Sequence, residues 1–225
     1  MSFILNIDTA SEKAHVSFAK DGLVLHALYS DSQKEHASFL QAAILELTRI
    51  TGLKLSDLDA IAVTAGPGSY TGLRVGMASA KGLCYALDKP LILLSTLEVL
   101  AVSALELFPS TAESVLLCPM IDARRMEVFT AIYQHDLAPY LSPRALILDE
   151  TSFENELFSN KILFFGSGSG KWNSVCKHSN AIFEKVTILP GAMARYADKF
   201  YVEKRFTNLV YSEPLYLKDF QTITI

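Results

Sequence analysis

A glycine-rich segment is the first part of this sequence with residue types suited to ligand chemistry. Residues 65–83 read AGPGSYTGLRVGMASAKGL and follow an apolar stretch at residues 61–64. Gly66 and Gly68 allow backbone angles that other residues avoid, so this loop can turn sharply and direct free amide groups outward. We therefore expect a binding junction between a strand and a helix. The alternative is a connection that needs glycine only for its turn.

Polar residues at the end of the first apolar stretch are a second candidate. Asp8 ends the run FILNID and is followed by Thr9 and Ser11. A carboxylate in this place could orient a water molecule or a magnesium ion beside a bound phosphate. The alternative is an acidic turn residue, because Asp is common in turns.

The glycine motifs do not fit the familiar nucleotide-binding templates. Gly66, Gly68 and Gly72 miss the dinucleotide-binding spacing by one residue. The segment GSGSGKW at residues 166–172 has one residue too few for a P-loop, and Trp172 stands where serine or threonine is required. Neither segment is therefore expected to be a dinucleotide or P-loop site.

Other catalytic templates fail as well. The sequence has no G-x-S-x-G motif, and its five histidines are dispersed. Leu40 stands four residues after His36, where a helical metal site would place its second ligand. We expect no catalytic residue and no metal site.

Composition limits the functional class further. The net charge of −4 and the pI near 5.7 argue against a broad nucleic-acid-binding face. Three cysteines without a C-x-x-C pair favour a reducing compartment, so we expect a cytoplasmic location. No basic leader opens the chain, and polar residues interrupt the most apolar stretch, residues 91–107. We therefore expect neither a signal peptide nor a membrane span.

One pattern, an apolar run that ends in Ile-Asp, occurs twice. Residues 3–20 and 115–133 each have the alternation of a β-hairpin with a polar tip. This repetition predicts an α/β fold of two similar halves, although two unrelated hairpins would fit the pattern as well. We expect a first lobe over residues 1–108 and a smaller second lobe over residues 109–225, with a helix at 190–205 packing back on the first.

Four segments together resemble the TsaB family, also called YeaZ. In chain order they are ILNIDTASEKAHVSF, EHASFLQAAILEL, AGPGSYTGLRVGMASAKGL and IDARRMEVFTAIY, within residues 1–135. The resemblance implies the actin-like ATPase fold of the ASKHA class, which is ribonuclease H-like. It also implies a non-catalytic subunit that binds the homologous TsaD, together with the ATPase TsaE, for transfer of threonylcarbamoyl to the adenosine beside the tRNA anticodon. A small ATPase or kinase of the same superfamily is the alternative.

The resemblance also bears on cofactors. A pair of histidines four residues apart holds a metal in TsaD, whereas this chain has only His36, so the catalytic centre does not carry over. The hairpin tips DTASEK and DARR lack the glycine that lets backbone amides approach phosphate. We expect no cofactor, or at most weak ATP or ADP binding. The degenerate site would comprise Asp8, Thr9, Ser11, Gly66, Gly68, Gly166 and Gly168.

Two expected helices, over residues 33–51 and 71–87, are the candidate partner interface. Gly72, Gly76 and Ala80 recur every fourth residue and form a stripe along which another helix could lie closely. The alternative is that the stripe packs on the protein's own sheet. Without TsaD, the same surface is expected to form a homodimer. The interface residues would be His36, Phe39, Leu40, Ala43, Tyr70, Gly72, Leu73, Arg74, Gly76, Met77 and Ala80.

The second hairpin tip carries Asp122, Arg124 and Arg125. These residues would either join the two lobes through salt bridges or lie near tRNA in the assembled complex. We favour the first, because two arginines provide little RNA affinity. We expect the chain to meet tRNA only through the complex.

Overall fold

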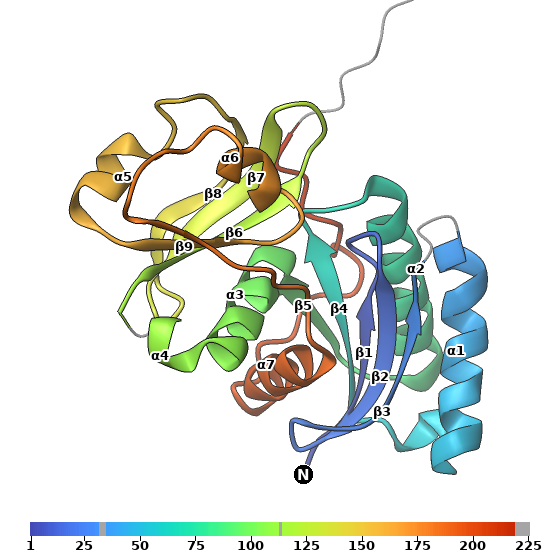
Figure 1. Ribbon diagram of the computed structural model, residues 1–225. Coiled ribbons are helices and arrows are strands. Elements are labelled where there is room, and N and C mark those ends of the chain that lie inside the picture. Colours follow the sequence, from blue (N-terminus) through green and yellow to red (C-terminus); the bar gives the residue numbers. More distant parts are fainter. Residues whose placement is uncertain (32–34, 113, 219–225) are drawn as a thin grey trace, which may run out of the picture.

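The computed structural model describes residues 1–31, 35–112 and 114–218. It contains two five-stranded sheets with helices around and between them (Figure 1). The first half contributes β1 (Phe3–Asp8), β2 (Ala14–Lys20), β3 (Leu23–Ser30), α1 (His36–Thr51), the 3-10 turn η2 (Leu55–Asp57), β4 (Ala60–Gly66), α2 (Tyr70–Leu87), β5 (Leu91–Ser95) and α3 (Thr96–Leu107).

The second half contributes α4 (Pro109–Ala112), β6 (Leu116–Asp122), β7 (Glu127–Tyr133), β8 (Pro139–Ile147), α5 (Glu154–Ser159), β9 (Ile162–Phe165), α6 (Ser169–Asn173), β10 (Ala181–Phe183) and α7 (Pro190–Val202). The start of the expected helix at residues 33 and 34 and the end of the tail, residues 219–225, lie outside the described residues.

The two sheets share one topology. The first has the order β3-β2-β1-β4-β5, and the second has the corresponding order β8-β7-β6-β9-β10. In each, three antiparallel strands are followed by two parallel ones. The repeated hairpins, β1–β2 and β6–β7, occupy equivalent positions. The predicted duplicated α/β architecture is therefore confirmed.

Helices cover both faces of the first sheet (Figure 1). Alternate residues of β1 explain why: Leu5 and Ile7 pack with α1 and α2, whereas Ile4 packs with the α7 side chains Met193 and Phe200. A strand that is apolar on both faces must be covered twice. The sheet thus fixes α1 and α2 as one outer layer and α7 as the opposite layer.

Helix α3 lies between the two sheets. Its residues Leu97 and Leu100 pack with Leu117 and Phe165 of the second sheet, whereas Val99 packs with the first. This helix begins where the Ser95 side chain accepts a hydrogen bond from the Glu98 amide, at 3.5 Å. It therefore joins both cores.

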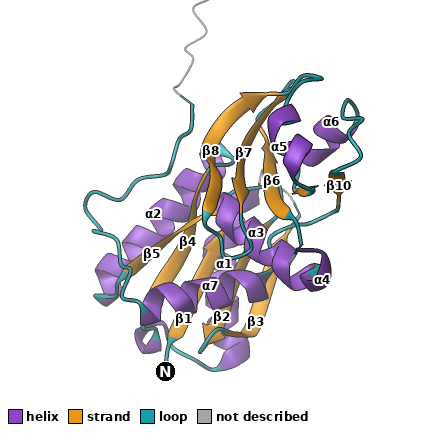
Figure 2. Ribbon diagram, turned by 90° about the vertical axis from the view of Figure 1, so that its left-hand side faces the viewer, coloured by secondary structure: helices purple, strands orange, loops and turns teal. Residues whose placement is uncertain are grey.

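The chain after α7 forms a strap, residues 207–218, that runs along the side of α2 and rises to the second lobe (Figure 2). The Lys81 ammonium donates to the Ser212 carbonyl at 2.9 Å, and the Lys218 ammonium pairs with the Glu127 carboxylate of β7 at 2.7 Å. The strap thereby connects the two lobes. Within the described ranges, every helix is too short or too polar to cross a lipid bilayer.

Candidate functional site

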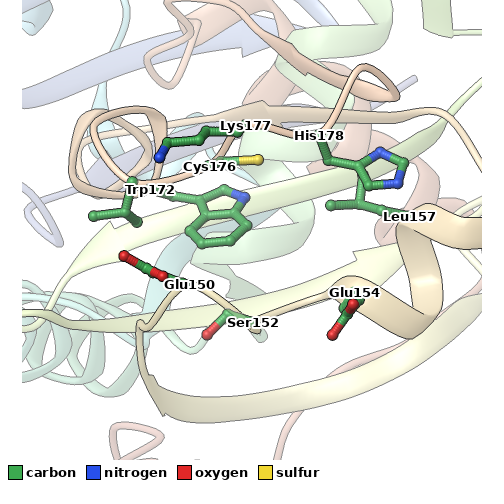
Figure 3. Close-up of a pocket in the computed structure, with 9 residues that line it drawn as sticks. Glu150, Ser152, Glu154, Leu157, Trp172, Cys176, Lys177 and His178 are labelled. Carbon is green, nitrogen blue, oxygen red and sulfur yellow. The ribbon is translucent and has the colours of Figure 1, made fainter.

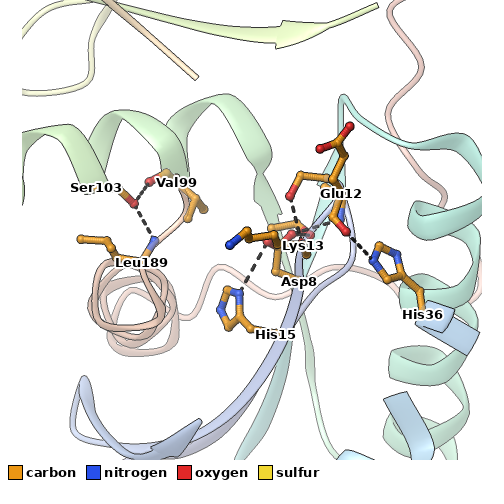
Figure 4. A network of polar contacts seen from close by, with 11 residues as sticks. Asp8, Glu12, Lys13, His15, His36, Val99, Ser103 and Leu189 are labelled. Carbon is orange, nitrogen blue, oxygen red and sulfur yellow. Dashed lines mark hydrogen bonds and ion pairs between the residues drawn. The ribbon is translucent and has the colours of Figure 1, made fainter. Parts of the chain in front are cut away.

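The tip of the first hairpin is closed by its own polar contacts (Figure 4). Asp8 is only 1% exposed. Its Oδ1 accepts hydrogen bonds from the Thr64 hydroxyl at 2.7 Å and the Ala10 amide at 3.1 Å, and its Oδ2 lies 3.6 Å from His15 Nδ1. The Asp8 carboxylate therefore fixes the turn through these contacts.

Burial also sets the charge of His15. Desolvation lowers the pKa of this imidazole, and the nearby Asp8 carboxylate raises it by less, so His15 is neutral in the fold. Between its unfolded pKa, near 6.5, and its lower folded pKa, the unfolded chain binds a proton that the folded chain does not. The stabilisation from neutral His15 is therefore complete above pH 6.5 and is lost as the pH falls below it.

This linkage gives a testable pH dependence. From pH 7.5 to 5.5, the protein should lose up to about 1.4 kcal/mol of unfolding free energy in total through His15, most of it below pH 6.5. The variant His15→Gln should lose less over the same range, because it lacks this titration. Urea unfolding at both pH values measures the difference. Equal losses in the two proteins would contradict the neutral assignment.

The glycine-rich loop packs tightly on the same hairpin tip. The Ser69 amide donates to the Ala10 carbonyl at 2.7 Å, and the Thr9 hydroxyl donates to the Gly72 carbonyl at 2.8 Å. A Cβ on Gly68 would overlap the Ala10 backbone. The loop is a strand-to-helix junction held against the tip, and Thr9 is buried. Ser11 is partly exposed and donates its hydroxyl hydrogen to the Lys13 carbonyl at 2.9 Å.

The predicted small-residue stripe on α2 faces the protein's own sheet. A Cβ on Gly72 would overlap the Thr9 carbonyl, and one on Gly76 would overlap the Thr9 hydroxyl. The expectation that this stripe is open to another protein is therefore wrong, and the alternative of internal packing holds. The same correction applies to the other buried residues of the expected interface, namely His36, Leu40, Ala43, Leu73, Met77 and Ala80.

His36 has a structural role at the start of α1. Its Nε2 lies 3.1 Å from the Glu12 carbonyl, so the side chain ties α1 to the first hairpin (Figure 4). Across residues 1–31, 35–112 and 114–218, His, Cys, Asp and Glu side chains do not gather in groups of three that would hold a metal ion.

A second stripe of small residues lies on the outer side of α2. Ala78, Gly82 and Ala86 also recur every fourth residue, and all three are exposed. A Cβ on Gly82 would meet no atom within 4 Å. The spacing of these small residues is the sequence signal for this stripe, and it is the same as the spacing in the inner stripe.

Exposed apolar side chains border the outer stripe. Tyr85 of α2 is 83% exposed and Leu45 of the neighbouring α1 is 71% exposed. The side-chain amide of Gln41 donates a hydrogen bond to the Ser79 hydroxyl at 3.0 Å, and this contact ties α1 to α2. We call this surface the helical face: Gln41, Ala42, Leu45, Val75, Ala78, Ser79, Gly82, Tyr85 and Ala86. Of the α1 residues expected at the interface, Phe39 is half-buried and therefore partly accessible, whereas His36, Leu40 and Ala43 are buried.

The strap occupies the other side of α2. Tyr216 packs on the Tyr70 ring, with 5.4 Å between the centroids, and accepts a hydrogen bond from Arg74 Nε at 3.1 Å. The Arg74 guanidinium also lies 4.0 Å from the centre of the Tyr70 ring. Tyr70 and Arg74, both predicted interface residues, are exposed, and Tyr216 of the strap contacts both of them. The Leu215 carbonyl covers Gly66.

The second hairpin tip belongs to its own lobe. The Asp122 carboxylate pairs with Lys171 of α6 at 2.8 Å and also accepts from the Arg124 amide at 2.6 Å. The ion pairs of the described residues do not include the guanidinium of Arg124 or Arg125. The favoured expectation of salt bridges between the lobes is wrong for these three residues, because Asp122 pairs within its own lobe and, among the described residues, no carboxylate pairs with either arginine.

The second glycine loop is likewise packed on a strand. The Gly168 amide donates to the Met120 carbonyl at 3.0 Å, and a Cβ on Gly166 would overlap that same carbonyl. The Ser167 hydroxyl accepts from the Asp122 amide at 3.1 Å. These glycines therefore allow α6 to approach β6, and the Gly168 amide is not free for phosphate.

Comparison with known proteins agrees with this architecture. The family model for TsaD, described as tRNA N6-adenosine threonylcarbamoyltransferase, matches residues 28–138. The chain is 31% identical over 223 residues to the tRNA threonylcarbamoyladenosine biosynthesis protein TsaB of Escherichia coli. The aligned region covers 96% of this chain and 94% of that protein.

Solved structures show the same fold. YeaZ from Pseudomonas aeruginosa matches with a TM-score of 0.78 and 25% identity, over 96% of this chain and 100% of that one. An inorganic polyphosphate/ATP-glucomannokinase from Arthrobacter sp. strain KM matches with a TM-score of 0.52 and 13% identity, over 91% and 100% of the two chains. The predicted actin-like ATPase fold is confirmed.

Proposed function

The chain belongs to the TsaB family, and on that premise we propose that it acts in forming threonylcarbamoyladenosine in tRNA by binding a TsaD homologue. The observation that carries the proposal is the helical face, where exposed Leu45 and Tyr85 border a stripe of small residues. Exposed apolar patches of this kind mark protein–protein interaction sites.

The shape of the helical face suits a partner helix. Ala78, Gly82 and Ala86 have almost no side-chain bulk, so a second backbone can come close to α2 along this line. Leu45 and Tyr85 would then close over the partner as anchoring contacts. An interface built on both helices would bury roughly 800 Å² per partner, the size of a standard specific interface.

A binding role rather than catalysis fits the interior of the first lobe. Asp8 and Thr9 are buried and bonded to neighbouring groups, and loop residue Gly68 lies against Ala10. We therefore propose that the chain has no catalytic residues of its own and binds ATP or ADP weakly at most.

The other partners are proposed from the family resemblance, from the same surface and from the charge. We propose that TsaE joins the pair of chain and TsaD, and that the helical face closes on a second copy when TsaD is absent. With a net charge of −4, the chain would meet tRNA only within the complex.

Reconstitution tests the proposed function. The chain, its TsaD and TsaE homologues, threonylcarbamoyl-adenylate and unmodified tRNA are mixed, and modified adenosine is measured. We expect omission of this chain to reduce the product at least about 100-fold, since a partner that completes the assembly contributes several kcal/mol. Full activity without the chain, or product formed by the chain alone, would contradict the proposal.

A further inference from the structure

The strap carries two neighbouring apolar side chains that are exposed next to α2. Val210 is 76% exposed and Tyr211 is 84% exposed. Both belong to residues 208–212, which we call the strap loop. Exposed apolar side chains that stand together mark interaction sites, whereas single ones are common on any protein surface. The helical face as defined above does not include this loop.

Hydrogen bonds hold the strap loop in one shape. Asn208 Oδ1 accepts from the Val210 amide at 2.9 Å, and the Ser212 amide donates to the Asn208 carbonyl at 3.1 Å. Leu209 packs against the core of the first lobe and anchors the loop there. A loop that is ordered before binding loses little conformational entropy in a complex, and this favours affinity.

Lys81 of α2 places the strap loop beside Tyr85. The Lys81 ammonium donates to the carbonyls of Val210 and Ser212, at 3.4 and 2.9 Å (Figure 2). At about 100° per residue, Tyr85 lies about 40° around α2 from Lys81 and about 60° from Gly82. Tyr85 therefore stands between the strap loop and the outer stripe. The strap loop and the helical face form one continuous surface.

The helical face is too small to form a standard interface by itself. A standard interface uses about 20–30 residues on each side, and the helical face has fewer than half as many. The remaining contacts must come from surface that adjoins it. This surface lies either beyond α1 or on the strap.

The strap border has the composition of an interface. At the α1 border, Glu46 and Arg49 form an exposed ion pair at 2.8 Å. At the strap border, Val210 and Tyr211 are exposed. The buried cores of interfaces are rich in aromatic residues and poor in charged ones. The contact surface is therefore expected to extend over the strap loop.

The cavity of about 340 Å³ in the second lobe has a different character (Figure 3). Its exposed side chains are charged or polar, and Glu150 and Glu154 stand at the end opposite Lys177 and His178. Trp172, in its wall, is only 1% exposed. This cavity is therefore suited to polar contacts, whereas the surface beside α2 is suited to an apolar partner.

We propose that the strap loop forms part of the surface that binds the TsaD homologue, with the Tyr211 ring as an anchoring contact. This inference rests on the proposed function, because it extends the same binding surface. The partner helix lies along Gly82, and apolar side chains next to that helix receive the rings of Tyr85 and Tyr211. The TsaD homologue should therefore carry an apolar patch beside its contacting helix.

Substitutions of the exposed ring test the inference. Tyr211→Ser should weaken binding of the TsaD homologue about 30-fold, the loss expected for an anchoring aromatic residue. Tyr211→Phe should bind within about fivefold of the unmodified chain, because it loses only one hydroxyl. Phe158→Ser, which removes an equally exposed ring from α5, should leave the affinity unchanged. Titration calorimetry measures the affinity, and thermal unfolding followed by circular dichroism checks that each variant is folded.

Gly82→Leu separates this inference from the proposed function. If Gly82→Leu loses binding while Tyr211→Ser binds as the unmodified chain does, the strap loop lies outside the interface. That result would overturn the inference and leave the proposed function standing. If neither variant loses affinity, both fail. A loss in Phe158→Ser equal to that in Tyr211→Ser would also overturn the inference, because the effect would not be local to the strap loop.

Discussion

Replacing Gly82 with leucine should abolish stable binding of the TsaD homologue. Gly82 lies in the middle of the outer stripe of α2, and a Cβ there meets no atom of its own chain within 4 Å. The leucine side chain would therefore project into the space that a partner helix needs. Overpacking of a close interface costs about 3 kcal/mol, which corresponds to a loss in affinity of about 100-fold. Titration calorimetry with purified TsaD homologue measures the affinity.

Gly170→Leu is the matched control. Gly170 is also a helical, exposed glycine whose Cβ would meet no atom within 4 Å, but it lies on α6 of the second lobe. We expect this variant to bind TsaD as the unmodified chain does. Equal affinity of both variants for the TsaD homologue would contradict the proposal that TsaD binds the helical face.

Gly76→Leu should instead damage the fold itself. A Cβ at this position would overlap the Thr9 hydroxyl and would lie 3.4 Å from Val63 Cγ2 and 3.7 Å from Ile7 Cγ2. To accommodate leucine, α2 must move away from β1. We expect a loss of more than about 3 kcal/mol of unfolding free energy, a large part of the stability of a typical domain. Urea unfolding followed by circular dichroism measures this change.

The two glycines on one helix make this prediction specific. Gly82→Leu should leave the unfolding free energy unchanged or raise it by up to about 1 kcal/mol, because leucine favours helix more than glycine does. If Gly76→Leu were as stable as Gly82→Leu, the inner stripe would not be packed against the Thr9 segment as described.

The duplicated architecture was readable from the sequence because it depends on local patterns. Alternating apolar residues after each Ile-Asp pair identify both hairpins, and the apolar stretch at residues 61–64 leads directly into the glycine-rich loop. Strand β8, with its exposed pattern and two prolines, and the short helix α5 have no such contrast. The sequence pattern therefore does not predict these elements of the second lobe.

The choice between the two stripes of α2 could not be made from spacing. Gly72, Gly76 and Ala80 have the same period as Ala78, Gly82 and Ala86, and the two series lie on different sides of the helix. Only the contact of Gly72 and Gly76 with Thr9 decides which series is internal, and that contact joins residues far apart in the sequence.

Burial of the first hairpin tip also cannot be predicted from residue type and spacing. Asp8, Thr9 and Ser11 have the residue types of a phosphate site, and a turn is polar in either case. The carboxylate of Asp8 is enclosed because Thr64 and His15, from two other strands, converge on it. Such convergence of separate strands depends on tertiary structure, whereas residue type and spacing describe only the local chain.

Site-specific photocrosslinking tests most directly whether TsaD binds the helical face. A benzoylphenylalanine in place of Tyr85, an aromatic residue 83% exposed on α2, should crosslink to the TsaD homologue. The same group in place of Phe158, 84% exposed on α5, should not. Crosslinking from position 158 with none from position 85 would contradict the account.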